Sequence, residues 1–127
     1  MVEGTDVTIV ATGHLVWESI EAAKILNESG ITTEVINIHT IKPLDKKIIL
    51  DSVKKTRCIV SAEEHNFLGG LGESISRVLA KNLPLPQEFV ATNDTFGESG
   101  TPAELMEKYG LNADSIVKKV KKVIARK

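Results

Sequence analysis

Two neighbouring glutamates, Glu63 and Glu64, a histidine and three glycines stand close together in the segment EEHNFLGGLGESI, from Glu63 to Ile75. Carboxylates and imidazoles are the side chains most often used for general acid–base catalysis. A glycine-rich loop that leads into a helix presents free backbone amides at the positive end of the helix dipole, where anions bind. The segment could therefore be a catalytic site, a cradle for a phosphate, or a tight corner with a structural role.

The three glycines of this segment, Gly69, Gly70 and Gly72, separate an apolar, strand-like run from a helical pattern. Their spelling, GGLGES, lacks the third glycine of G-x-G-x-x-G and the Lys-Ser/Thr pair of a P-loop. The first interpretation is structural: glycine lets the chain turn and lets the following helix approach the sheet closely. The second interpretation is binding of phosphate or sulfate by the loop amides.

Strand geometry limits which of the acidic and imidazole side chains could act together. Neighbouring side chains of a strand point to opposite faces, so at most one of Glu63 and Glu64 would join His65 in a catalytic site. Three histidines, His14, His39 and His65, each follow a predicted strand and could in principle hold zinc. Their spacing follows from repeated strand–helix units rather than from a ligand signature, so we predict no metal site.

Strand-like runs rich in β-branched residues alternate with amphipathic helical patterns along the chain. Strands joined by helices pair in parallel, since each helix returns the chain to the same end of the sheet. We therefore predict an α/β fold, a three-layer α/β/α sandwich with a mainly parallel sheet, as one domain over residues 1–127. The predicted strands are 6–13, 32–38, 57–62 and 87–92, and the helical patterns fall within the segments 14–30, 41–56, 71–82, 100–110 and 113–127.

Helix ends and faces can be predicted locally. Gly30 follows the first helical pattern and is expected to end that helix in the left-handed conformation. Asp45 precedes the second and is expected to be its N-cap. Ile48, Ile49 and Val53 recur at helical spacing and are expected to form the buried face of that helix.

Composition excludes several classes of protein. With 16 basic and 17 acidic residues, the net charge of -1 gives no overall field for nucleic acid or anionic lipid. The basic C-terminal run, VKKVKKVIARK, is interpreted as a solvated helix face that complements the helix dipole. No apolar run is long enough to span a membrane and no secretory signal is seen. We expect a cytoplasmic protein without nucleic-acid or membrane partners.

Most of the chain resembles the C-terminal domain of transketolase. The most specific matching pieces are TIKPLD, the EEH whose histidine is followed four residues later by GGLGE, and the G-x-P-x-E-L-x-x-x-x-G-L run from Gly100 to Leu111. Related domains close 1-deoxyxylulose-5-phosphate synthase and the beta subunits of 2-oxo acid dehydrogenases. The last run is usually spelled differently in those proteins, so transketolase is the preferred relative.

The resemblance implies a partial role in a larger enzyme. Transketolase moves a two-carbon ketol unit between sugar phosphates, using thiamine diphosphate and a divalent metal, Mg or Ca. In the family, this cofactor lies between a pyrophosphate-binding and a pyrimidine-binding domain of paired subunits. The family's metal motif, G-D-G followed by N, is absent from the sequence. The resemblance thus implies a noncatalytic domain that packs on those two domains and helps a homo-oligomer form, without catalytic, cofactor or metal residues of its own.

Within that role, the edge with Glu64, His65, Gly69, Gly70 and Gly72 is expected either to meet the neighbouring domain or to hold an anion. The chain alone is expected to be inactive. Two alternatives stay open: the corresponding domain of a 2-oxo acid dehydrogenase beta subunit, and a free-standing flavodoxin-like module that binds a small anion.

Overall fold

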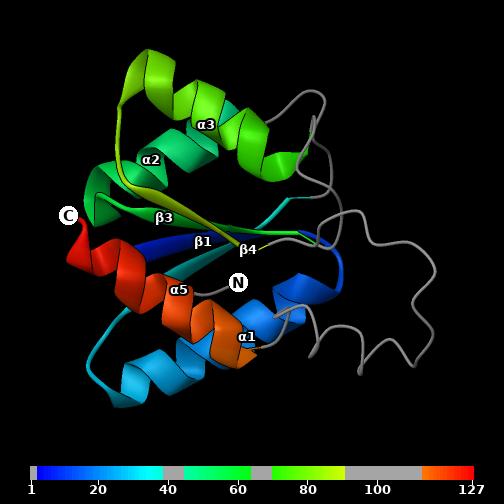
Figure 1. Ribbon diagram of the computed structural model, residues 1–127, viewed down its shortest axis with the longest axis vertical. Coiled ribbons are helices and arrows are strands. Elements are labelled where there is room, and N and C mark those ends of the chain that lie inside the picture. Colours follow the sequence, from blue (N-terminus) through cyan, green and yellow to red (C-terminus); the bar gives the residue numbers. More distant parts are fainter. Residues whose placement is uncertain (1–2, 39–44, 64–69, 91–112) are drawn as a thin grey trace.

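The computed structural model describes residues 3–38, 45–63, 70–90 and 113–127. In these residues a single sheet is covered by helices on both faces (Figure 1). The strands are β1 (Val7–Ala11), β2 (Thr33–Asn37), β3 (Ile59–Ala62) and β4 (Gln87–Val90), and the helices are α1 (His14–Glu28), α2 (Lys46–Thr56), α3 (Leu71–Asn82) and α5 (Ala113–Ala125). The helix predicted for 100–110 and the TIKPL residues 40–44 lie outside the described residues.

Every pair of neighbouring strands in this sheet is parallel, in the order β2-β1-β3-β4. β1 is central, with Ile9 opposite Val35 of β2 and Val60 of β3. α1 and α5 cover one face of the sheet, and α2 and α3 cover the other (Figure 1). The predicted three-layer α/β sandwich with a parallel sheet is confirmed. The carboxyl ends of the strands therefore share one edge, where α1 and α3 begin.

The core has two halves because side chains alternate along each strand. Ile9 and Val60 face α1 and α5, whereas Val10 and Ile59 face α2 and α3. All five residues of β1 are buried, as expected for a central strand of a parallel sheet. The helix side chains that fill the two halves include Leu15, Leu26, Ile116, Val120 and Val123 on one face and Ile49, Val53, Leu71, Ile75 and Leu79 on the other.

Both predicted helix ends are confirmed. Gly30 has a φ of +83°, the left-handed conformation that glycine adopts without strain. Asp45 caps α2, and its Oδ1 accepts a hydrogen bond from the backbone N–H of Ile48 at 3.2 Å. Local sequence chemistry was sufficient for both.

The predicted buried face of α2 is partly wrong. Ile48 is 37% exposed, although the other two predicted apolar positions are buried. Ser52 and Thr56 are buried instead, and their hydroxyls lie 2.7 and 2.6 Å from Thr8 Oγ1 of β1. A hydroxyl on the sheet thus turns the polar side of α2 towards the core, because buried hydroxyls require hydrogen-bond partners.

Two carboxylates near the amino ends of β1 and β2, Asp6 and Glu34, have lowered pKa values. Burial alone would raise the pKa of Glu34, but hydrogen bonds from Lys55 and Ser52 and the charge of Lys55 bring it below its ordinary value of 4.5. Lys55 Nζ lies 2.7 Å from Glu34 Oε1. Hydrogen bonds from the backbone and side chain of Thr32 lower the pKa of Asp6 below its ordinary value of 3.8.

A carboxylate with a lowered folded-state pKa stabilises the fold above its unfolded-state pKa, and this stabilisation is lost as the pH falls through the folded-state value. For Glu34 it is complete above about pH 4.5. We expect Glu34→Gln to lower the thermal unfolding midpoint at neutral pH, and the difference from wild type to shrink in acid, where Glu34 itself becomes neutral. Unfolding followed by circular dichroism across this pH range measures the difference.

Asp51→Asn is the matched control, because Asp51 is exposed and pairs with Lys47 one turn away in α2, at 3.2 Å. Its effect should be small at every pH. A Glu34→Gln difference that stays constant into strong acid would contradict the assignment.

Candidate functional site

The candidate site lies at the carboxyl edge of the sheet, where β3 ends and α3 begins. Of the predicted site residues, Gly70 and Gly72 lie there, at the start of α3. Glu64, His65 and Gly69 lie outside the described residues, so their predicted role is untested by the geometry. The structure instead brings a residue from the same motif, Glu63, against the start of the helix.

Glu63 caps α3 with its carboxylate. Its side chain is almost fully buried, with Oε1 accepting from the N–H of Leu71 at 3.1 Å and Oε2 from the N–H of Gly72 at 2.6 Å. The first N–H groups of a helix lack partners within the helix. A negative charge at this end is also favoured by the helix dipole. An internal carboxylate therefore occupies the position at which an external anion would bind.

Gly72 lets α3 approach the sheet. A Cβ atom on Gly72 would lie 2.6 and 2.8 Å from ring carbons of Phe89 and 2.9 Å from Ser61 Oγ. Such distances are too short for carbon atoms, so only glycine fits without movement of its neighbours. The close approach of helix to sheet that the structural interpretation expects is present at Gly72. Gly70 is the N-cap of α3 at φ −84°, which other residues also adopt.

β4 also holds the first turn of α3. Gln87 Nε2 donates to the carbonyl oxygen of Gly72 at 3.0 Å, and Gln87 Oε1 lies 2.8 Å from Ser76 Oγ. The first turn is thus bonded to β3 through Glu63 and to β4 through Gln87. Sequence reasoning missed both contacts. Strand alternation was the available signal for Glu63, because it shares a face with Ser61, which also contacts this turn.

This arrangement disfavours acid–base chemistry or anion binding by the described residues at this edge. The N–H groups of Leu71 and Gly72 already have an ionisable acceptor. An external anion would have to displace Glu63 and would be repelled by its carboxylate. What the geometry provides is a rigid start for α3 and a fixed pair of ends for the segment 64–69.

The described residues were also searched for metal sites and membrane spans. Among them, no three His, Cys, Asp or Glu side chains lie together as metal ligands. His39, His65 and the side chain of His14 are not described, so the zinc hypothesis falls outside the described residues. None of the helices in the described part is long and apolar enough to cross a membrane.

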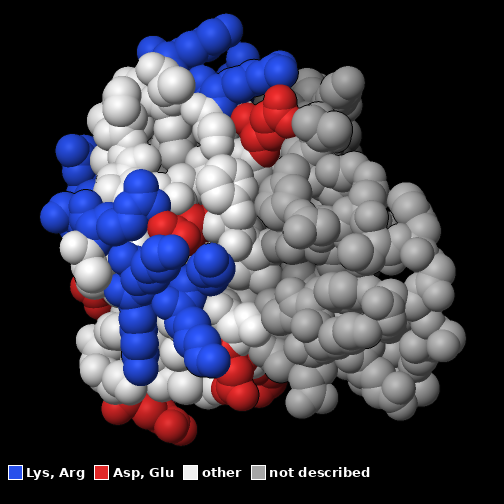
Figure 2. Space-filling view, in the orientation of Figure 1, with Lys and Arg blue, Asp and Glu red and all other residues white. Residues whose placement is uncertain are grey.

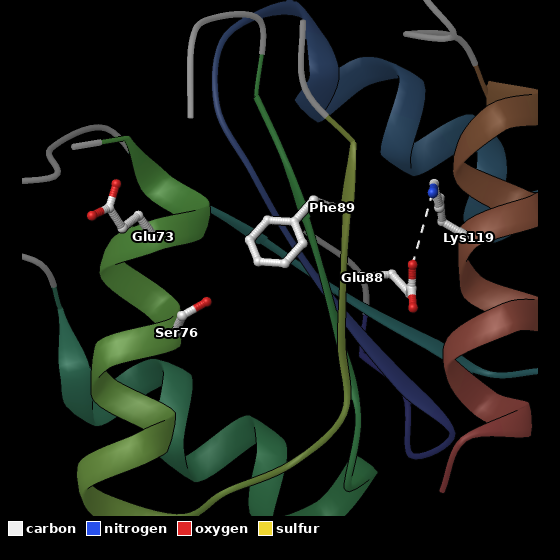
Figure 3. A pocket seen from close by; sticks show the side chains of 5 residues that line it. All are labelled: Glu73, Ser76, Glu88, Phe89 and Lys119. Carbon is white, nitrogen blue, oxygen red and sulfur yellow. Dashed lines mark ion pairs between the residues drawn. The ribbon is translucent and has the colours of Figure 1, made fainter. Parts of the chain in front are cut away.

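Away from this edge, a hollow of about 490 Å³ lies over β4 between α3 and α5 (Figure 3). It is lined by Glu73 and Ser76 of α3, Glu88 and Phe89 of β4, and Lys119 of α5. Phe89 is turned towards α3 and Glu88 towards α5 (Figure 3). The charged side chains that line the hollow already form ion pairs. Glu73 lies 3.4 Å from Arg77, one turn further along α3.

Glu88 is the centre of an ion-pair cluster that attaches α5 to the sheet. Its carboxylate lies 3.8 Å from Lys119, 3.7 Å from Lys122 and 2.5 Å from Arg126. Arg126 also donates to the carbonyl oxygen of Gln87 at 2.9 Å. These contacts hold the last helix against the last described strand, so we interpret the hollow as structural rather than catalytic.

Removal of the Glu63 carboxylate should loosen the start of α3. We expect Glu63→Ala to lower the free energy of unfolding by about 1–3 kcal/mol, because two buried N–H groups lose their acceptor. Glu63→Gln keeps an acceptor oxygen and should cost less. Denaturant unfolding measures the loss, and hydrogen exchange of the Leu71 and Gly72 amides should accelerate before that of the strands.

Glu73→Ala is the control in the same turn, because Glu73 is part-exposed and its pair with Arg77 is worth at most about 1 kcal/mol. If Glu63→Ala costs no more than this control, Glu63 does not hold the helix.

A methyl group at Gly72 should force α3 away from Phe89. We expect Gly72→Ala to destabilise the protein by about 1–3 kcal/mol, although alanine is the better helix former. In the double variant with Phe89→Ala the clash with the ring is removed, so the two costs should be strongly non-additive. Additive costs in a double-mutant cycle would contradict the close approach.

Comparison of the sequence with known proteins identifies the family that the sequence was found to resemble. A family model described as transketolase, C-terminal domain, matches residues 1–116. A 6-deoxy-6-sulfo-D-fructose transketolase subunit of Clostridium sp. (strain MSTE9) is 45% identical over 125 residues, which are 98% of this chain and 39% of the relative. Transketolase of Homo sapiens is 35% identical over 121 residues, 94% of this chain and 19% of the relative.

A solved structure agrees. A chain titled split gene transketolase, inactive beta4 tetramer, superposes with a TM-score of 0.93 at 44% identity, over 98% of this chain and 41% of that one. The chain thus spans about two fifths of the length of its most similar relatives named here. The resemblance noted in the sequence is confirmed, and the chain belongs to the transketolase C-terminal domain family.

Proposed function

We propose that this chain is the noncatalytic C-terminal portion of a thiamine diphosphate-dependent transketolase, which contributes domain packing and assembly rather than reacting groups. Family membership supports the enzyme class, and similar chains are named a transketolase subunit and a split gene transketolase. These names favour transketolase over the beta subunit of a 2-oxo acid dehydrogenase. The relatives are more than twice as long, so they have polypeptide with no counterpart here.

In this proposal the coenzyme and its divalent metal, Mg or Ca, bind outside this chain. The family resemblance assigns them to the pyrophosphate- and pyrimidine-binding domains of paired subunits. When bound there, thiamine diphosphate supplies the carbanion chemistry of ketol transfer between sugar phosphates. Residues of this chain supply surfaces that pack against those domains in a homo-oligomer, which we expect in the cytoplasm.

Of the two roles expected for the edge with Glu64, His65, Gly69, Gly70 and Gly72, we favour contact with the neighbouring domain. The observation that carries this choice is the Glu63 carboxylate on the amides of Leu71 and Gly72. It provides internally what an anion would provide, and it fixes both ends of the intervening segment. Anion binding stays a prediction that requires displacement of Glu63.

Reconstitution tests this proposal. The chain is mixed with separately produced polypeptide that carries the pyrophosphate- and pyrimidine-binding domains, with thiamine diphosphate and Mg²⁺ present. We expect ketol transfer only in the mixture. Hydrogen exchange should slow at residues 63–72 on complex formation, while the far end of α3, at Lys81, stays unchanged as an internal control.

Two results would overturn it. Conversion of sugar phosphates by the 127-residue chain alone would show that it has its own reacting groups. An active complex without protection at residues 63–72 would remove the docking role of this edge.

A further inference from the structure

The outer edge of β4 is a place where a further strand could join the sheet. Among the described residues, β4 is the last strand on its side, next to β3. The hollow over β4 is lined from both faces of the sheet, by Glu73 and Ser76 of α3 and by Lys119 of α5. A hollow that touches the helices of both faces lies beside the edge of the sheet (Figure 3). It is therefore the space that an added strand would occupy.

The backbone of β4 directs polar groups into this space. In a parallel pair, successive residues of a strand direct their backbone groups alternately towards the partner strand and away from it. The carbonyl oxygens of Pro86 and Val90 accept from the N–H groups of Ile59 and Glu63, at 3.2 and 2.9 Å. Gln87 therefore directs its N–H and C=O groups away from β3, to the outer edge. Groups of this kind are the template on which a strand of another chain can pair.

Arg126 occupies the outward carbonyl group of Gln87. Its Nη1 donates to that oxygen at 2.9 Å, and the same nitrogen lies 2.5 Å from Glu88 Oε2. Glu88 is only 9% exposed, so its carboxylate is a fixed anchor for the guanidinium. Hydrogen bonds from a charged donor are stronger than those between neutral groups. A strand that paired with β4 would have to take this carbonyl group from Arg126.

Other features of β4 oppose strand addition as well. The strand has four residues, and Pro84 and Pro86, which have no N–H to donate, precede it. Figure 2 shows basic side chains gathered over α5, and Lys119 and Lys122 among them pair with Glu88 of β4. Two copies that paired antiparallel through β4 would bring these basic side chains together. Short edge strands, prolines and lysines are the usual protection of an exposed sheet edge.

We propose that Arg126 closes the edge of β4 to strands of other copies of the chain. The prolines shorten the edge and the lysines repel an approaching copy, whereas Arg126 bonds directly to the backbone group that an added strand needs. Without Arg126, the hollow beside β4 becomes a site for strand addition. This role goes beyond the proposed function, because it concerns the side of the sheet and not the carboxyl edge that contacts another domain.

Replacement of Arg126 tests the proposal in the 127-residue chain. Arg126 follows Ala125, the last residue of α5, and is exposed, so Arg126→Ala leaves the core intact. We expect this variant to self-associate about tenfold more strongly than wild type, because one hydrogen bond from a charged donor no longer competes with the added strand. Sedimentation velocity measures the association at about 0.5 M salt, where the remaining lysines are screened. Hydrogen exchange of the Gln87 amide should slow in the associated protein.

Two matched variants separate the carbonyl contact from the rest of the ion-pair cluster. Lys122→Ala removes another partner of Glu88, at 3.7 Å, and leaves Arg126 on Gln87, so it should associate like wild type. Arg126→Lys keeps a charged donor and should gain less association than Arg126→Ala. Circular dichroism compares the fold of all variants.

Several results would overturn the proposal. Arg126→Ala could associate no more strongly than wild type, or only when it is unfolded. It could associate without slower exchange at Gln87, which would place the contact elsewhere. Equal association of Lys122→Ala and Arg126→Ala would show that the cluster as a whole, rather than the bond to Gln87, controls the edge.

Discussion

The structure depends on one constraint, the parallel pairing of β1 with strands on both of its sides. Parallel strands cannot be joined by tight turns, so each connection includes a helix that must cover a face of the sheet. β1 is consequently buried on both faces, and the core divides into an α1–α5 half and an α2–α3 half. The same pairing gathers the carboxyl ends of the strands, and with them the start of α3, at one edge.

At that edge, an apparent reaction site has a structural explanation. Acidic residues, a histidine and glycines suggested catalysis or phosphate binding, yet Glu63 satisfies the helix N-terminus and Gly72 admits Phe89. Gln87 adds a bond from the neighbouring strand. The first turn of α3 is therefore fixed from two strands at once. A rigid edge of this kind suits contact with another domain, which agrees with membership of a domain family found within larger enzymes.

The sequence predicted what local chemistry decides. Strand and helix order, the left-handed Gly30 and the Asp45 cap all depend on residues within a few positions of each other. The sequence could not predict contacts that form only when distant segments of the chain pack together. Thr8 turns Ser52 inward from 44 residues away, which leaves Ile48 partly exposed. Glu88 finds Arg126 across 38 residues. Glu63 was weighed as an acid or base because its target, the N-terminus of α3, becomes adjacent only after β3 and α3 have packed.

The central claim is that the Glu63 carboxylate binds the N–H groups at the start of α3, so that this helix end is not a ligand site. Titration of the chain with inorganic phosphate, followed through the amide resonances of Leu71 and Gly72, tests it most directly. The account predicts that neither resonance shifts in a saturable way, because Glu63 already accepts from both N–H groups. Saturable shifts confined to these amides would show that an external anion takes that place, and would contradict the account.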